Sequence, residues 1–217
     1  MGTITRSFAN NITTGGVLLP ASLVNNSIAN VTAYNAAVAT GGMKLISSQT
    51  ASASASISFT TGIDSTYKEY QFWFINIHPS TLAAFQFNMS TDSGSNYNVT
   101  KTTTSFAAYH NEAGTDAVLE YQASEDLAQS TAFQEIASSV TADNDAQVSG
   151  VLQLFNPAST TYVKHFLIDS NNYRNNNYSW RNLVAGYGNT TSAVNAVQFK
   201  MSSGNIDDGT ILMFGIV

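Results

Sequence analysis

Apolar and polar residues alternate along most of the chain from residue 43 onward. A period of two predicts β-strands that turn one face toward a core. Ten or eleven short strands are expected, at residues 44–48 leading into 51–59, and at 67–77, 82–91, 101–109, 117–123, 133–140, 148–156, 162–169, 178–187, 193–202 and 210–217. No long amphipathic helix competes with them. The pattern predicts an all-β fold, an antiparallel β-sandwich or jelly roll over residues 43–217.

For two of these segments the sequence allows more specific predictions. In residues 51–59, alanine and serine alternate strictly, which predicts a strand with a small apolar face that a second sheet or another subunit approaches closely. Residues 67–77 are dense in aromatic and β-branched side chains, and Pro79 follows them. We expect a central strand that is covered on both faces and ends at this proline.

Residues 1–42 differ from the rest of the chain in composition. They carry one charge, Arg6, and few aromatic residues, with Gly15, Gly16 and Pro20 as punctuation. Such a segment cannot form a core by itself, so it is either a disordered tail or an extended arm that lies on another protein. Regularly placed apolar residues favour an anchoring arm that binds a partner, namely Ile4, Phe8, Ile12, Val17, Leu18, Leu19, Leu23, Ile28 and Val31.

Charge and composition narrow the classes of partner. The net charge is −6 with eight Lys and Arg, which argues against binding to nucleic acid or to anionic membranes. The chain has no cysteine, which excludes disulfides and thiolate chemistry. No signal peptide and no apolar run of membrane-spanning length is recognisable, so synthesis in a cytosol is expected.

Candidate catalytic and metal-binding patterns are weak. His78, His110 and His165 stand far apart, without the close pairs typical of zinc sites. No Gly-x-Ser-x-Gly turn is present, and the carboxylates show no glycosidase-like arrangement. The segments 92–96 and 143–145 are rich in oxygen ligands for calcium, but the same residues favour plain turns. We expect no enzyme activity, no cofactor and no metal.

Residues 171–181 combine amides, tyrosines, a tryptophan and two arginines, the side chains that recognise sugars and polar surfaces. One interpretation is a surface recognition site. The other is a polar hairpin whose aromatic rings pack sideways on the domain. The candidate recognition residues are Tyr173, Arg174, Tyr178, Trp180 and Arg181.

Several stretches resemble accessory virion proteins of tailed bacteriophages, marine ones in particular. They are Met1–Gly16 at the start, Ile63–Tyr70, Asn76–Pro79, Leu154–Pro157, and Met201–Ile211 with Phe214–Ile216 at the end. The resemblance covers most of the chain and its motifs are structural, so it carries no catalytic residues. It implies a virion location, with assembly in the host cytoplasm.

Sequence and resemblance together predict a capsid decoration, or cement, protein. It would bind the major capsid protein or another virion protein through its arm and its sandwich, and form a homo-oligomer, with a trimer favoured. The alternative is a tail fibre or spike component that binds a host glycan through Tyr173–Arg181. A glycan-cleaving enzyme is the third hypothesis, and no carboxylate spacing favours it.

Overall fold

The computed structural model describes residues 42–175 and 177–217. The expected arm, residues 1–42, lies outside the described residues except for Gly42, and so do the nine apolar residues assigned to it. The arm therefore stays a prediction from the sequence.

The described part of the chain is built from twelve strands, and the all-β expectation is confirmed. Their bounds are β1 (Met43–Thr50), β2 (Ile57–Phe59), β3 (Glu69–Pro79), β4 (Ala83–Ser90), β5 (Lys101–Asn111), β6 (Ala117–Tyr121), β7 (Gln134–Val140), β8 (Val148–Phe155), β9 (Lys164–Arg174), β10 (Tyr178–Gly188), β11 (Ala196–Met201) and β12 (Ile206–Ile216). All named pairings are antiparallel.

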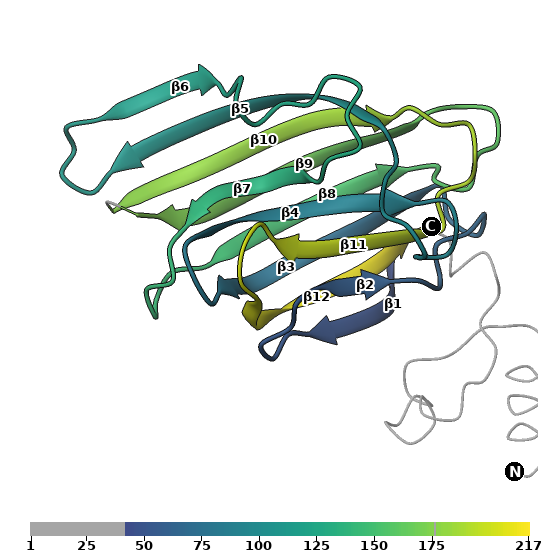
Figure 1. Cartoon of the computed structure of the whole chain (residues 1–217), viewed down its shortest axis with the longest axis horizontal. Coiled ribbons are helices and arrows are strands. Elements are labelled where there is room, and N and C mark those ends of the chain that lie inside the picture. Colours follow the sequence, from purple (N-terminus) through teal and green to yellow (C-terminus); the bar gives the residue numbers. More distant parts are fainter. Residues whose placement is uncertain (1–41, 176) are drawn as a thin grey trace, which may run out of the picture. The chain divides into compact units, whose positions relative to one another are not determined.

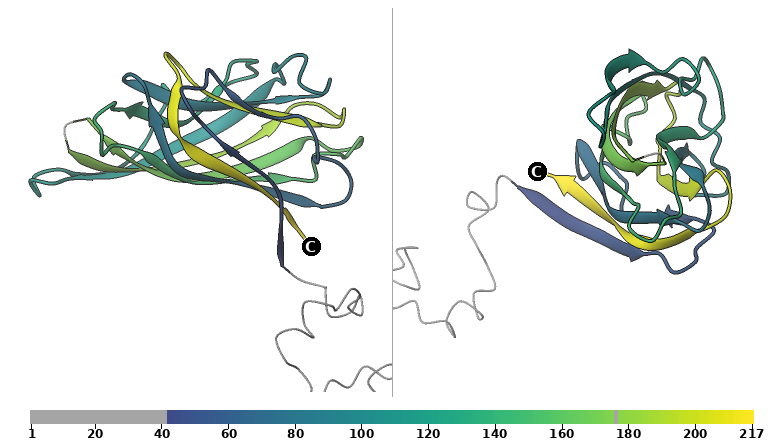
Figure 2. Two further views of the ribbon diagram at one scale, coloured as in Figure 1. Left: turned by 90° about the horizontal axis from the view of Figure 1, so that it is seen from below. Right: turned by 90° about the vertical axis from the view of Figure 1, so that its left-hand side faces the viewer.

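The pairings arrange the strands in two layers that lie over one another (Figure 1). One layer has the order β1-β12-β3-β8-β9-β10-β5-β6, and the other has the order β2-β11-β4-β7. A single residue pair, Val140 with Arg174, joins the two layers through β7 and β9. Viewed end-on, the strands curve around a common core (Figure 2, right). We call the layers the larger sheet and the smaller sheet.

Eight of the strands follow the order of a jelly roll. β1-β12-β3-β8 lie against β2-β11-β4-β7, and successive strands alternate between the two sheets except β4 and β7, which pair within the smaller sheet. The other four strands come from two insertions, β5–β6 after β4 and β9–β10 after β8. They pair with one another and widen the larger sheet beyond β8, which explains why it is twice as wide as the smaller one.

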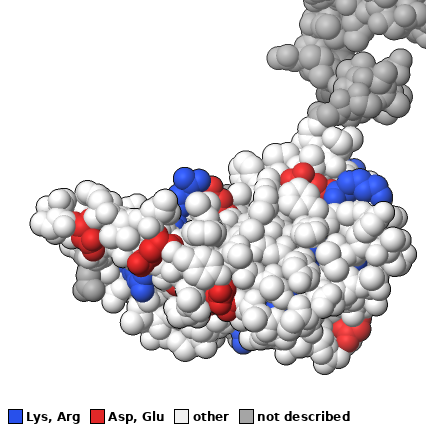
Figure 3. All heavy atoms as spheres, turned by 90° about the horizontal axis from the view of Figure 1, so that it is seen from above, with Lys and Arg blue, Asp and Glu red and all other residues white. Residues whose placement is uncertain are grey.

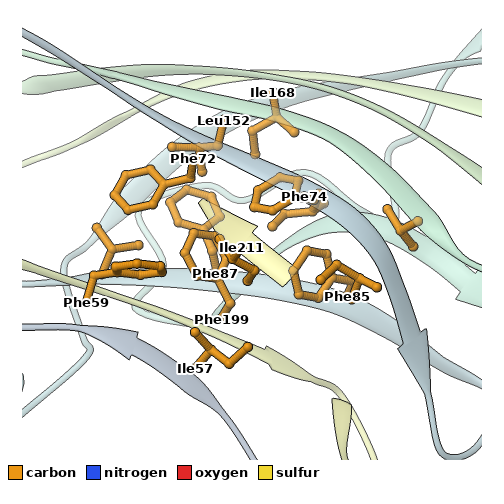
Figure 4. Packing of buried hydrophobic residues seen from close by; sticks show 14 of the residues in the cluster. Ile57, Phe59, Phe72, Phe74, Phe85, Phe87, Leu152, Ile168, Phe199 and Ile211 are labelled. Atoms are coloured by element: carbon orange, nitrogen blue, oxygen red, sulfur yellow. The ribbon is translucent and has the colours of Figure 1, made fainter. Parts of the chain in front are cut away.

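The core between the sheets is aromatic. Phe199 of β11 lies at its centre, with ring centroids 5.4 Å from Phe72, 5.3 Å from Phe74, 6.0 Å from Phe85 and 6.2 Å from Phe59 (Figure 4). Most of these pairs meet edge to face or tilted, the geometries that ring quadrupoles favour. The alternation in β3, β4 and β11 thus supplies one continuous hydrophobic core.

The prediction of a strand over residues 51–59 is wrong for its first half. Between β1 and β2 the backbone turns a corner, with Ala53 at a φ of +48°, and only Ile57–Phe59 form a strand. Of the three alanines only Ala51 is buried. The reason is topological: in a jelly roll this connection must cross from one sheet to the other, and small residues fit the crossing.

The segment Asp207-Asp208-Gly209 falls between the expected strands 193–202 and 210–217 and has the residue types of a turn, but it lies inside β12. It forms an irregularity in the pairing with β3, where the register shifts on both sides of Asp208. Gly209 has a φ of +117°, and a β-carbon there would lie 2.6 Å from the carbonyl oxygen of Asn76. Turn-forming residues therefore serve here to bend a strand rather than to end it.

Candidate interaction surface

The outward side of the larger sheet carries apolar side chains on most of its strands. Strand alternation and pairing bring one row of side chains together across it, and the row runs Tyr121, Phe106, Leu183, Asp169, Val151, Trp73 and Leu212. These residues alternate along each strand with the buried side chains that face the core. We call this side, from β1 to β6, the outer face.

Large apolar side chains on the outer face stay exposed. Trp73 and Ile75 of β3 are 40% and 41% exposed, Phe106 of β5 is 43% exposed and Leu167 of β9 is 46% exposed. These strands lie next to one another or are linked by β8 and β10, so the exposed groups belong to one surface. Large apolar side chains exposed together on one side of a sheet are a common feature of interaction sites, so this side is the candidate surface.

The exposed rings are held in pairs. Trp73 lies 5.5 Å from Phe214 of the neighbouring β12, and Phe106 lies edge-on to Tyr121 of β6 at 5.2 Å. The indole nitrogen of Trp73 donates a hydrogen bond to the side-chain oxygen of Gln71 at 3.0 Å. These contacts restrict the rings before any partner binds, which lowers the entropy lost on binding.

Two adjoining hollows interrupt the outer face. One of about 320 Å³ is lined by residues that include Phe106, Val151 and Leu183, and one of about 450 Å³ by residues that include Phe155 and Tyr187. Both are lined by Thr104, Leu167 and Ala185. Because small side chains on β5 and β10 lie between larger ones, the surface has depressions that fit apolar side chains.

Charge is sparse on the molecule, and charged side chains stand apart among uncharged atoms in Figure 3. In the middle of the outer face, the guanidinium of Arg181 donates two hydrogen bonds to the carboxylate of Asp169, at 2.9 and 2.6 Å. These bonds raise the pKa of Arg181. The two charges compensate each other, so a partner that covers this region need not supply a counter-charge.

β1 and the end of β12 extend from the sandwich as a two-stranded ribbon (Figure 2). Met43 and Leu45 at the beginning of β1 are exposed, as is Val217 at the end of the chain. The ribbon is closed by a hydrogen bond from the backbone nitrogen of Val217 to the carbonyl oxygen of Gly42. Its apolar side chains continue the outer face past the sandwich.

The five candidate recognition residues lie on the β9–β10 hairpin, on two different sides. Tyr173 and Arg181 belong to the outer face, whereas Arg174, Tyr178 and Trp180 point to the opposite side. The structure therefore does not gather them into one site.

Trp180 is 7% exposed, and its ring stacks on Tyr109 at 3.9 Å with an interplanar angle of 4°. The guanidinium carbon of Arg174 lies 3.9 Å from the same ring. Tyr178 donates a hydrogen bond to Asp116 at 3.0 Å, which raises the pKa of the tyrosine hydroxyl. This packing corresponds to the second interpretation of the segment, a hairpin with aromatic rings lying sideways on the domain.

The candidate metal ligands either lie apart from one another or already accept hydrogen bonds within their own turn. Within residues 42–175 and 177–217, no group of three or more His, Asp and Glu side chains could hold a metal ion. Asp92 accepts hydrogen bonds from Ser90 and Asn96 within its own turn, and these bonds lower its pKa to about 2. The turn interpretation of residues 92–96 thus agrees with the structure.

Trp73, Phe106 and Leu167 were not singled out from the sequence. The signal was present in residues 67–77, where both alternating sets contain large apolar residues, Trp73 and Ile75 in one and Phe72 and Phe74 in the other. We interpreted it as a strand covered on both faces, and among the described residues only the inner face of β3 is covered. The outer face could have been identified from a row of apolar side chains that no second sheet of the same domain is available to cover.

A scan against models of known protein families finds no match to this chain, and a search of curated proteins finds no similar sequence. Separately, no helix able to span a membrane is found in the part of the chain that the structure describes.

Proposed function

We propose that the protein is a structural subunit of a bacteriophage particle, a capsid decoration protein that attaches to neighbouring virion subunits through an apolar surface. The observation that carries the proposal is the outer face, on which Trp73, Ile75, Phe106 and Leu167 remain exposed on one wide sheet. Such a surface is costly for a protein that works alone in water, and it is useful in an assembly.

Three further features support this setting. Stretches such as Ile63–Tyr70 and Met201–Ile211 resemble those of phage virion proteins. The jelly roll is an architecture that viral capsid domains use, which is an argument by analogy. The composition, with few charges and many amides and hydroxyls, allows large contact areas to form with little desolvation of charge.

The tail-fibre alternative assigns glycan binding to residues 173–181. It stays a prediction, and the burial of Trp180 leaves little of that ring for a sugar to stack on. Glycan-array binding that is lost in Trp180→Ala but kept in Trp73→Ala would favour this alternative over the decoration protein.

Imaging of intact particles at subunit resolution tests the proposal. We expect the jelly roll on the capsid surface in hundreds of copies, with the outer face against another subunit. A few copies at the tail tip, or a protein absent from purified particles, would contradict it. Removal of residues 1–42 is expected to abolish attachment while the circular-dichroism spectrum of the sandwich stays intact.

A further inference from the structure

We propose that the outer face of the larger sheet receives residues 1–41 of a neighbouring copy of this chain. The inference rests on the proposed function, because a segment that covered its own face would leave no apolar surface for assembly. It adds the identity of the partner: a second copy, contributing a specific segment.

The length and attachment of the segment suit this exchange. Forty-one residues precede Gly42, and an extended chain spans at most about 3.3–3.6 Å per residue, so its reach is on the order of 100 Å. The eight strands of the larger sheet, spaced at about 4.8 Å, are roughly 35 Å across. The segment joins the sheet at β1, an edge strand whose Met43 and Leu45 are exposed. It is therefore long enough to leave one molecule and cross the face of another.

The segment 1–41 and the outer face are chemically compatible. The segment carries Arg6 as its only charge, and its apolar side chains are mostly aliphatic. On the outer face, the central Arg181 and Asp169 already neutralise each other. Contact between the two surfaces therefore buries apolar area on both sides, and it does not strip water from unpaired charges in the centre of the face.

The depressions in the outer face also suit aliphatic side chains in size. The two adjoining hollows meet at Leu167 and Ala185, and aromatic side chains form other parts of their walls. Leu18, Leu19 and Leu23 in the segment are of a size to enter such depressions, while its glycines allow the backbone to approach the sheet closely. A flat second copy of the sheet would leave these hollows unfilled.

Disulfide trapping tests the inference in the full-length protein, because the chain contains no cysteine of its own. Leu167→Cys is placed on one chain, and Phe8→Cys, Leu19→Cys or Ile28→Cys on another chain of different mass. The two chains are mixed and oxidised mildly. A matched control replaces Leu167→Cys by Leu82→Cys, since Leu82 is apolar and 53% exposed but lies between β3 and β4, outside the outer face.

For at least one of the three segment positions, we expect the disulfide between chains to form at least fivefold faster with Leu167→Cys than with Leu82→Cys. Equal rates at all three positions would overturn the inference, as would faster joining of Leu167→Cys to itself, which indicates packing of face on face. Chains that carry both cysteines and close the bond mainly within one molecule would also overturn it. None of these outcomes involves a phage particle, so the proposed function is judged separately by imaging.

Discussion

Large apolar side chains lie on both faces of β3, yet the two faces have different surroundings. Phe72 and Phe74 on the inner face are covered by the smaller sheet, while Trp73 and Ile75 on the outer face are about two-fifths exposed. The outer set also holds Glu69 and Gln71, so its apolar part is limited to Trp73 and Ile75. The comparison teaches that hydrophobicity specifies that a face needs a cover, and topology decides whether the same chain provides it.

The largest expected effect comes from truncating the inner face. Phe72 contacts Phe59 and Phe199, each with ring centroids 5.4 Å apart. Phe72→Ala leaves a cavity in the aromatic core and should lower the free energy of unfolding by about 3–5 kcal/mol. Trp73→Ala, one residue away, should lower it by less, about 1–2 kcal/mol, because the side chain is 40% exposed, as judged by urea unfolding of both variants. Equal losses would show that the two faces do not differ as described.

The next effect concerns a cation on the inner side. The ammonium of Lys101 is fully buried and donates hydrogen bonds to Asn88 at 2.6 Å and to the carbonyl oxygen of Val99 at 2.8 Å, both uncharged. Burial lowers its pKa to about 7. The unfolded lysine keeps its proton up to about pH 10.5, so between pH 7 and 10.5 the unfolded state binds more protons than the native state.

The free energy of unfolding should therefore rise between pH 7 and 10.5, by on the order of 2–4 kcal/mol. Below pH 7 the full cost of burying the charged ammonium should be present. Lys101→Met removes the charge at similar volume, and Asn88 still accepts a hydrogen bond from the backbone of Met89. Chemical unfolding at pH 6 and pH 9 should show a flatter profile for this variant and greater stability at pH 6. If Lys101→Met left the slope of stability against pH unchanged, Lys101 would not be the cause of that slope.

Disruption of the outer face should affect association more than folding. Leu167→Asp places a charge between the two hollows and should weaken self-association at least tenfold, about 1.4 kcal/mol, in analytical ultracentrifugation. Its free energy of unfolding should change by less than about 1 kcal/mol, because Leu167 is half exposed. Leu82→Asp serves as the matched control and should associate like the parent protein. Identical behaviour of the two variants would argue against the outer face as an interface.

The smallest effect is expected for the cation on the outer face. Arg181 and Asp169 form an exposed pair, and such pairs contribute little to stability. Arg181→Ala should change the free energy of unfolding by less than about 1 kcal/mol, with the difference disappearing at 1 M salt. A larger, salt-independent loss would mean that Arg181 has a packing role comparable with that of the buried residues.

Much of the fold is readable from the sequence because strand alternation is regular. The strand expected over residues 82–91, found as β4, and the end of β3 at Pro79 agree with the predictions. The failures concern connections between strands. Residues 51–56 alternate like a strand but cross between sheets, and residues 207–209 resemble a turn but lie in a bent strand. Local pattern describes a strand's two faces, while long-range pairing decides where the chain turns.

The candidate surface was harder to predict than the fold. The sequence drew attention to Trp180, which the structure stacks on Tyr109, and not to Trp73, which is exposed. Both tryptophans lie in aromatic strand segments, so composition does not distinguish them. What separates them is which side of the larger sheet each occupies, and that depends on the register of strands distant in sequence.

If a partner covers the outer face in the assembled protein, the exposure of the two tryptophans reports it directly. Acrylamide quenching of fluorescence is recorded at concentrations below and above self-association, with Trp180 as the internal reference because it is 7% exposed and Trp73 is 40% exposed. We expect assembly to lower the quenching of Trp73 to the level of Trp180. Assemblies in which Trp73 stays as accessible as in the single molecule would contradict it.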